Sequence, residues 1–182
     1  FFFEILEQSK KIIMINPRRK ILTRQNLAMQ MGRGIVCELG VAKGNYSHII
    51  LNNPKCVCLY SIDRWSDHHD EDEYKSVVKR FRRYGNRSKI IRSSFKNALK
   101  LFPKAIFNFI YVDGYAHTGQ ENGKTLEDWW DKLLPMGCFA GHDYHPKWQP
   151  TIDAVDSFVS RVGLPMHLTT NDKYNSWYII KK

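Results

Sequence analysis

Acidic and histidine side chains stand directly after several short apolar runs of the sequence. Asp63, Asp113 and Asp143 each follow such a run, and His142 precedes the last of them. A carboxylate at such a place can accept paired hydrogen bonds from the two hydroxyls of a ribose. Two carboxylates that converge repel each other unless a cation lies between them, and imidazole exchanges protons near neutral pH. These residue types point to nucleotide binding combined with proton transfer or metal-assisted chemistry.

A turn with two glycines follows the first apolar run, in the segment 38–44. Gly40 and Gly44 allow a tight turn and a close approach of the backbone to a ligand. The spacing differs from the G-x-G-x-x-G pattern of dinucleotide-binding folds, in which the pyrophosphate rests on amides at a helix start. The turn therefore disfavours NAD, and Asp63 is the candidate for binding a ribose, with a helix cap as its alternative role.

Three of the seven histidines lie near the ends of predicted strands: His117, His142 and His145. A lone histidine is ordinarily a surface or core residue, but three near one predicted cleft favour proton transfer by at least one of them. His117, four residues after Asp113, is the preferred candidate. His145 precedes Pro146 and fits a surface loop.

Strands alternate with helices along the chain, which predicts a mainly parallel sheet with helices on both faces. Residues 1–30 are expected to form two helices broken near Asn16-Pro17. A capping box at Thr125 is expected to open a helix that carries Leu133 and Leu134 on its apolar face. The expected strands are 34–39, 56–62, 89–92, 106–112, 137–141, 166–169 and 177–180, and the other expected helices are 46–51, 67–84, 94–102 and 151–162.

The formal net charge of +10 is concentrated in one segment. Residues 75–104 contain 11 basic side chains and no acidic one, and an acidic run at 67–73 precedes them. Acids at the start of a helix and bases at its end complement the helix dipole. The pattern favours a solvated helix face over a phosphate-binding patch, which stays open as the alternative.

The sequence indicates neither a membrane-spanning helix nor a secretion leader. No apolar run approaches the ~18 residues that a membrane-spanning helix needs, and residues 1–4 lack a basic-then-apolar leader. The four cysteines lie in strand-like segments and are expected to be small buried side chains and not disulfides or zinc ligands. We expect a cytoplasmic protein, or a domain of a longer polypeptide.

Four segments, in this order, resemble the motifs of class I S-adenosylmethionine-dependent methyltransferases. They are Glu38-x-Gly40-x-x-x-Gly44, Asp63, the segment 107–114 with His117 after it, and the segment 135–144. The resemblance runs from about residue 34 to 181 and is greatest for the small-molecule branch with "IDG...H" and "GHDY" motifs. It implies an α/β, Rossmann-like domain over residues 34–182, with a seven-stranded, mostly parallel sheet and an antiparallel last strand. Residues 1–33 would be an N-terminal helical extension.

The same resemblance implies S-adenosylmethionine as the cofactor. Two of the implied residues have an alternative role, because Trp65 could be a packing aromatic and Glu38 could cap neighbouring amides. The implied cofactor residues are Glu38, Gly40 and Gly44 for the methionine part, Asp63 for the ribose, Trp65 over the adenine, Ser93 or Ser94 at the ring edge, and Asp113.

The acceptor atom is expected to be oxygen. The sequence lacks the N-P-P-[YF] or D-P-P-[YF] motif that related enzymes use to methylate amino groups of nucleic acids. In metal-dependent catechol and sugar O-methyltransferases, which the chain resembles here, acids at the positions of Asp113 and Asp143 bind Mg²⁺. His142 stands where another acid or an Asn is common, so it is a candidate third ligand for Mg²⁺ or Mn²⁺, or a base. The catalytic candidates are His117, Asp143 and His142.

The residues and the resemblance together predict a metal-assisted O-methyltransferase. The resemblance implies a hydroxyl of a sugar or glycan as the acceptor, with the chain as a small-molecule enzyme or as one module of a larger glycan-building polypeptide. One alternative is a methyltransferase for RNA or another nucleic acid that uses the segment 75–104. Another is a catalytically inactive binding module, against which the intact Gly40, Gly44 and Asp63 argue.

Overall fold

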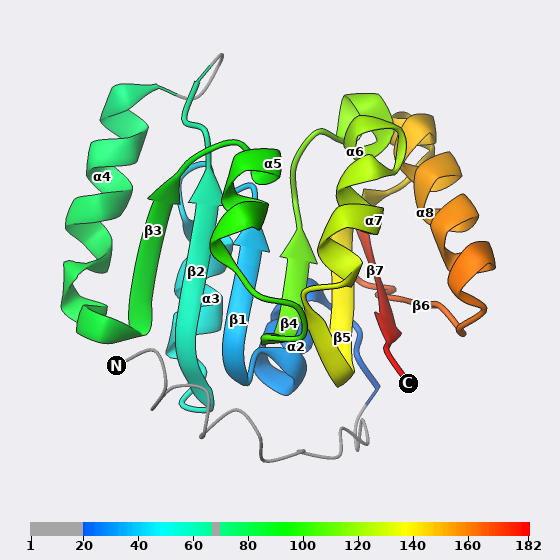
Figure 1. The fold of residues 1–182 in the computed structure, drawn as a ribbon, viewed down its shortest axis with the longest axis horizontal. Helices are drawn as coiled ribbons and strands as arrows, with labels where there is room; N and C mark the ends of the chain where they lie inside the picture. The colour runs from blue at the N-terminus through cyan, green and yellow to red at the C-terminus, as the bar shows by residue number, and fades with distance from the viewer. Residues whose placement is uncertain (1–19, 67–69) are drawn as a thin grey trace.

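Seven strands form one sheet, in the order β3-β2-β1-β4-β5-β7-β6 (Figure 1). The computed structural model describes residues 20–66 and 70–182. Neighbouring strands from β3 to β5 pair in parallel, whereas β7 runs antiparallel to both β5 and β6. This is the predicted α/β sheet. The strands are β1 (Gly34–Leu39), β2 (Cys56–Asp63), β3 (Ser88–Arg92), β4 (Phe107–Val112), β5 (Leu133–Tyr144), β6 (His167–Leu168) and β7 (Asn175–Ile180).

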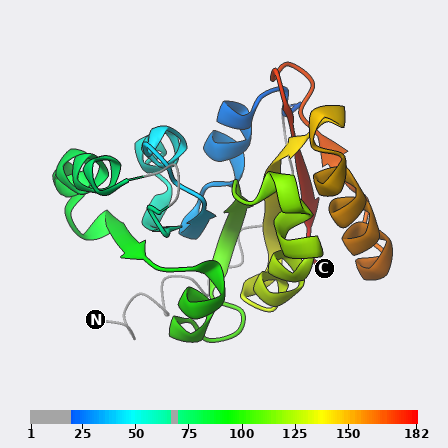
Figure 2. The same cartoon turned by 90° about the horizontal axis from the view of Figure 1, so that it is seen from above.

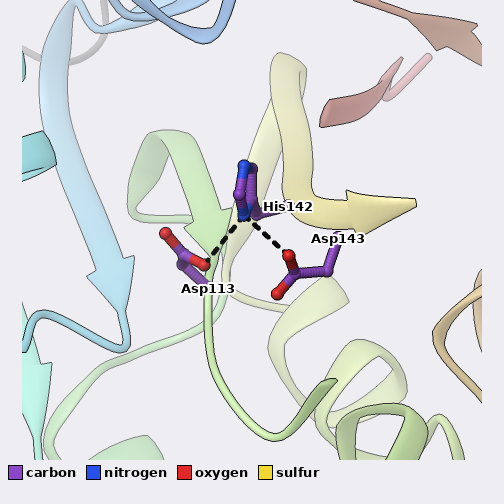
Figure 3. A group of neighbouring side chains, drawn as sticks. All are labelled: Asp113, His142 and Asp143. Atoms are coloured by element: carbon purple, nitrogen blue, oxygen red, sulfur yellow. Dashed lines mark ion pairs between the residues drawn. The ribbon is translucent and has the colours of Figure 1, made fainter. Parts of the chain in front are cut away.

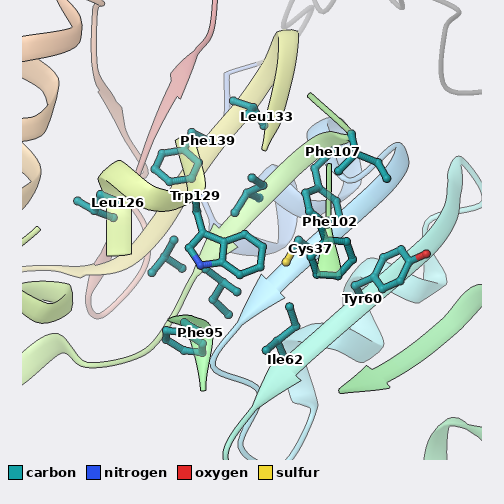
Figure 4. Packing of buried hydrophobic residues seen from close by; sticks show 14 of the residues in the cluster. Cys37, Tyr60, Ile62, Phe95, Phe102, Phe107, Leu126, Trp129, Leu133 and Phe139 are labelled. Atoms are coloured by element: carbon teal, nitrogen blue, oxygen red, sulfur yellow. The ribbon is translucent and has the colours of Figure 1, made fainter. Parts of the chain in front are cut away.

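Helices cover both faces of the sheet (Figure 2). One buried cluster joins α2 (Arg24–Met31), α3 (Asn45–Asn52) and α4 (Glu71–Phe81) to one face. A second cluster joins α5 (Phe95–Ala98), α7 (Lys124–Trp130) and α8 (Gln149–Val162) to the other face, with several aromatic side chains at its centre (Figure 4). The remaining short helices are η1 (Arg82–Arg87), η2 (Leu99–Leu101), η3 (Ala116–Thr118), α6 (Gly119–Asn122) and η4 (Pro146–Trp148).

The helix predicted to start at a capping box is different in the structure. Helix α7 begins after Gly123, whose φ is 81°, and Thr125 lies inside the helix, where its hydroxyl donates to Glu121. Leu133 and Leu134 belong to β5 and not to this helix, because Leu133 pairs with a residue of β4. The capping box and the helical placement of these leucines were therefore wrong.

The basic helix is shorter than the sequence predicts. The Asp70 side chain accepts hydrogen bonds from two amides of the first turn of α4, and the helix changes to η1 after residue 81. The predicted start at 67–69 lies outside the described residues, as does the first of the two predicted N-terminal helices; the second is α2. All four cysteines are buried and free, as predicted.

Strand β5 departs from regular pairing near its carboxyl end. Gly141 pairs with Trp177 and Tyr144 with Asn175, so three steps along β5 face two along β7. The extra residue makes a β-bulge. Within it, Asp143 adopts a φ of 61°, in the left-handed region. The bulge interrupts the regular alternation of side chains along β5, at the point where β5 lies beside the end of β4.

Within residues 20–66 and 70–182, the helices are too short or too polar to cross a bilayer.

Candidate active site

A cavity of about 650 Å³ opens where β1, β2, β4 and β5 end. This is the edge at which open α/β sheets bind ligands, and the volume lies in the usual range for small-molecule sites. One end of the wall comes from the turns after β1 and β2: Gly40, Ala42, Asp63, Arg64 and Ser66. The other end comes from the segments after β4 and β5: Asp113, Tyr115, His117, Glu121, Asp143 and Trp148.

Glycine is required at both ends of the turn between β1 and α3. Gly40 has a φ of 93°, and a Cβ atom there would lie 2.2 Å from the carbonyl oxygen of Asp113. Gly44 has a φ of 72° and precedes α3, and its Cβ would lie 2.7 Å from the ring of Phe81. The turn therefore packs against the end of β4 and against α4 with no room for side chains.

Asp63 holds this turn in place. Its Oδ2 accepts hydrogen bonds from the amides of Val41 (2.7 Å) and Ala42 (2.9 Å), and its Oδ1 accepts one from the amide of Trp65 (3.0 Å). A carboxylate offers about four acceptor positions, so three are occupied. Asp63 lines the cavity, but it caps backbone amides, which is close to the alternative role considered for it.

Trp65 and the two serines do not line the cavity. The side chain of Trp65 is buried in the core; its indole donates to the carbonyl of Ala42 and its ring packs against Tyr74. Ser94 caps α5 by accepting from the amide of Asn97, and Ser93 is likewise not part of the wall. For Trp65 the packing alternative therefore describes the structure. Arg64, Ser66 and Phe95, which the sequence reasoning did not select, line the cavity instead.

Glu38 lies in a smaller neighbouring pocket of about 260 Å³, which Asp113 also lines. Its side chain is buried and accepts a hydrogen bond from the hydroxyl of Ser47. Burial raises the pKa of Glu38 to about 8, because the charged form loses its hydration, although the Ser47 hydroxyl opposes this shift. The pKa of Glu38 is thus shifted upward, whereas its neighbour Asp113 has a lowered pKa.

Asp113, His142 and Asp143 form a cluster at the ends of β4 and β5 (Figure 3). Nδ1 of His142 lies 3.0 Å from Oδ1 of Asp143 and 3.4 Å from Oδ1 of Asp113. One potential ligand atom from each residue lies within 4.8 Å of the other two. The bulge in β5 makes this possible, since it lets two consecutive residues contribute. The three predicted metal ligands therefore come together, and both aspartates line the cavity, with His142 outside its wall.

Arg24 of helix α2 joins this cluster, which the sequence reasoning missed. Its Nη2 donates to Oδ2 of Asp113 at 3.1 Å, and its Nη1 lies 3.3 Å from Nε2 of His142. The guanidinium lies over the ring of Tyr46, 4.4 Å from the centroid, and 5.6 Å from that of Tyr111. No local pattern around Arg24 indicates this contact, since the residue lies in the segment 1–33 that was expected to be only a helical extension.

The charges of the cluster shift one another's pKa values. Burial alone would raise the pKa of Asp113, but its bonds to His142 and Arg24 hold that pKa below its ordinary value. Burial alone would lower the pKa of His142, but the two carboxylates raise it to about 9. The cluster is therefore a mutually stabilised set of two carboxylates and two basic groups.

The two other candidate histidines, His117 and His145, lie in different places. His117 lines the cavity and is exposed, near Glu121 and Trp148 on the same wall. His145 lies outside the wall and accepts from the amide of Lys147. The buried indole nitrogen of Trp148 has no hydrogen-bond partner among the residues that the structure describes.

The comparisons with known proteins place the chain among methyltransferases. A family model described as a methyltransferase domain matches residues 37–144, which include the glycine turn and the Asp113–Asp143 cluster. The search of curated protein sequences gave no significant match.

Several solved structures share the fold at low sequence identity. A Staphylococcus aureus protein provisionally described as a caffeoyl-CoA O-methyltransferase is 15% identical, with a TM-score of 0.70 over 97% of this chain and 91% of that one. An O-methyltransferase from Bacillus cereus, in complex with SAH, is 12% identical, with a TM-score of 0.68 over 99% and 90%. An rRNA methylase from Streptococcus thermophilus is 15% identical, with a TM-score of 0.64 over 91% and 99%. At this identity the likeness establishes the fold alone.

Proposed function

Because the chain belongs to the methyltransferase-domain family, we propose that it transfers a methyl group from S-adenosylmethionine to a hydroxyl of a sugar or glycan. The observation that carries this proposal is that one cavity, of about 650 Å³, joins the glycine turn to Asp113 and Asp143. A transferase needs its methyl donor and its acceptor side by side, since alignment of the reacting atoms supplies much of the rate. The cavity has room and suitable groups for both.

The turn between β1 and α3 fits S-adenosylmethionine. Gly40 presents bare backbone to the cavity, and one acceptor position of Asp63 remains for a ribose hydroxyl. The pocket that contains Glu38 and Arg24 offers a carboxyl group and a guanidinium, which suit the amino and carboxylate groups of a methionine moiety. Folds of the same kind have been solved with SAH, the product of the donor.

Proton removal at the acceptor end falls to residues of the cavity wall. S-adenosylmethionine supplies an electrophilic methyl group, and the acceptor hydroxyl must lose its proton as it attacks. His117 stands on the wall and is the proposed base, which takes the proton of the attacking hydroxyl; Asp143 accepts a hydrogen bond from a second, neighbouring hydroxyl of the acceptor and so orients it. His142 touches both aspartates from outside the wall, so we assign it a positioning role and not a catalytic one.

The wall near the acceptor suits a neutral, hydroxyl-rich molecule. Trp148 and Tyr115 supply aromatic surface, against which the apolar face of a sugar ring can pack. Asp113 and Asp143, whose charges Arg24 and His142 compensate, offer acceptor oxygens to hydroxyl groups, and Glu121 adds a further carboxylate, which disfavours phosphate. The observations therefore support a sugar in preference to a polyphosphate chain.

Asp113, His142 and Asp143 supply ligand atoms that suit a divalent cation, but the positive charge of Arg24 beside them does not. Two carboxylates and an imidazole are suitable donors for Mn²⁺ and related ions. Arg24, however, already donates to one of these carboxylates and contacts the imidazole. The proton transfer proposed for His117 therefore does not involve a metal ion.

The test is transfer of isotopically labelled methyl from S-adenosylmethionine to a panel of monosaccharides, oligosaccharides and RNA. We expect label on a sugar oxygen, and loss of transfer in His117→Ala with retained binding of S-adenosylhomocysteine. Label in RNA that persists at roughly 200 mM salt would instead favour the nucleic-acid alternative, whose basic segment lies toward the β3 edge of the sheet (Figure 1). Cofactor binding without transfer to any acceptor in the panel would favour the inactive binding module.

A further inference from the structure

We propose that Arg24 is the built-in cation of the Asp113–His142–Asp143 cluster, so that the protein holds these two carboxylates together without a divalent metal ion. The inference rests on the geometry of the cluster and not on methyl transfer. Its catalytic consequence, a metal-independent reaction, rests on the proposed function.

The guanidinium occupies the sides of the cluster that face away from its centre. Oδ1 of Asp113 and Nδ1 of His142 face each other and Asp143. The outer atoms of the same two residues, Oδ2 of Asp113 and Nε2 of His142, both face Arg24, at 3.1 and 3.3 Å. A permanent positive charge therefore lies directly beside the place that a metal ion would take.

Arg24 is held in this position by its whole environment. Thr23 caps the helix, the Arg24 amide donates to Asp172 at 2.7 Å, and the hydroxyl of Tyr46 donates to the Arg24 carbonyl at 3.0 Å. The guanidinium packs against the neighbouring rings of Tyr46 and Tyr111, and 22% of the Arg24 side chain is exposed. Backbone and side chain of Arg24 therefore both have partners that hold the guanidinium at the cluster.

The charge of Arg24 opposes a divalent ion at this site. The ion would place two further positive charges beside Arg24 in a partly buried site, where water screens charges weakly. The carboxylates that make the cluster look like a metal site are thus already compensated.

The compensating charge comes from outside the region that matches the family model. That match begins at residue 37, and Arg24 lies before β1. Helix α2 packs its buried side chains against the same sheet face as α3, so this helix and the cluster form one structural unit. The segment predicted to be a mere N-terminal extension therefore completes the site.

The experiment measures Mn²⁺ binding directly, by electron paramagnetic resonance and calorimetry on the full chain. We expect the wild-type protein to bind Mn²⁺ with a Kd above about 1 mM, the weak end of the range for oxygen-ligand sites. Arg24→Met should bind at least about tenfold more tightly, a change of ~1.4 kcal/mol. Arg24→Lys, which keeps the charge, should stay weak. Asp143→Asn in the Arg24→Met background should abolish the gain.

Arg161→Met is the matched control. Arg161 forms an ion pair with Glu127, with 2.6 Å between Nη2 and Oε1, and belongs to helix α8 and not to the cluster. It should bind Mn²⁺ as the wild type does. Tight binding of one Mn²⁺ per wild-type chain that Asp143→Asn removes would overturn the proposal, as would an unchanged Kd in a folded Arg24→Met protein. The wild-type measurement decides by itself if Arg24→Met does not fold. Methyl transfer measured separately in EDTA distinguishes failure of this proposal from failure of the proposed function.

Discussion

Replacement of Asp63 by alanine separates its two roles, support of the glycine turn and binding of a ribose. The carboxylate accepts from the amides of Val41, Ala42 and Trp65 at 2.7, 2.9 and 3.0 Å. Asp63→Ala leaves all three donors without their partner. The substitution removes no core packing, because the side chain lies at the cavity wall.

The expected loss of stability follows from these three hydrogen bonds. A hydrogen bond to a charged group contributes about 1.5–3 kcal/mol, but the three share one carboxylate and water can reach the cavity wall. We therefore expect Asp63→Ala to lower the free energy of unfolding by about 3 kcal/mol, less than the sum of the three. For a chain of this size that corresponds to a fall in Tm of roughly 6–12 °C.

The assay combines urea unfolding with calorimetry of S-adenosylhomocysteine binding to the folded protein. Asp63→Ala should bind this ligand about 10- to 150-fold more weakly. In the wild type, removing the ribose 2′-hydroxyl from the ligand should also weaken binding; in the variant it should have little further effect. Asp131→Ala, which removes a carboxylate from an exposed ion pair with Lys104, is the control and should change neither measurement.

Two results would refute the reasoning in different places. An unchanged urea midpoint would show that Asp63 does not hold the turn. A lower midpoint with unchanged affinity, or equal losses on removing the hydroxyl in both proteins, would show that Asp63 supports the turn without binding the ribose.

Three further predictions concern the glycine turn, the buried acid and the acceptor end. Gly40→Ala should destabilise the protein by more than about 2 kcal/mol in urea unfolding, since its Cβ would lie 2.2 Å from a carbonyl oxygen at a φ of 93°; Gly163→Ala, at a φ of 65° in open space, should cost less, and equal costs would contradict the argument. The pKa of Glu38 is raised from 4.5 to about 8, so between these pH values the folded protein binds more protons than the unfolded chain, and the free energy of unfolding should fall as pH rises from 4.5 to 8. Glu38→Gln should flatten that part of the stability profile, and an unaltered slope would show that Glu38 is not its source. His117→Ala should lower kcat by about 10²–10⁴ with little change in cofactor KM, and excess EDTA should leave the wild-type rate unchanged; a rate that EDTA abolishes would restore the metal-assisted mechanism.

The linear sequence determined the framework of the fold and the place of the chemistry. Apolar runs of strand length, separated by helical periodicity, predict a parallel sheet, and the polar residues that follow those runs must then meet at one edge. Gly40, Asp113 and Asp143 could therefore be selected correctly as residues of one cavity. Their positions depend on where each strand ends, and local composition marks strand ends.

Only the tertiary structure decided the direction of individual side chains. Trp65 lies two residues after Asp63, the last residue of β2, yet its ring is buried in the core. The backbone at Trp65 has a φ of 43°, and the indole N–H donates to the carbonyl of Ala42. The extra residue in β5 likewise brings Asp143 to the cavity wall beside Asp113, and a bulge has no reliable signal in the order of residues.

The partners of the acidic cluster were also beyond the sequence. Arg24 is 89 residues from Asp113 and 118 from His142 along the chain, and no periodic pattern relates them. Their contact exists because α2 packs on the same face of the sheet as α3 and points its first turn at the end of β4. Local patterns report the propensities of neighbouring residues, whereas charge compensation in a buried site depends on which distant elements the packing of the core brings together.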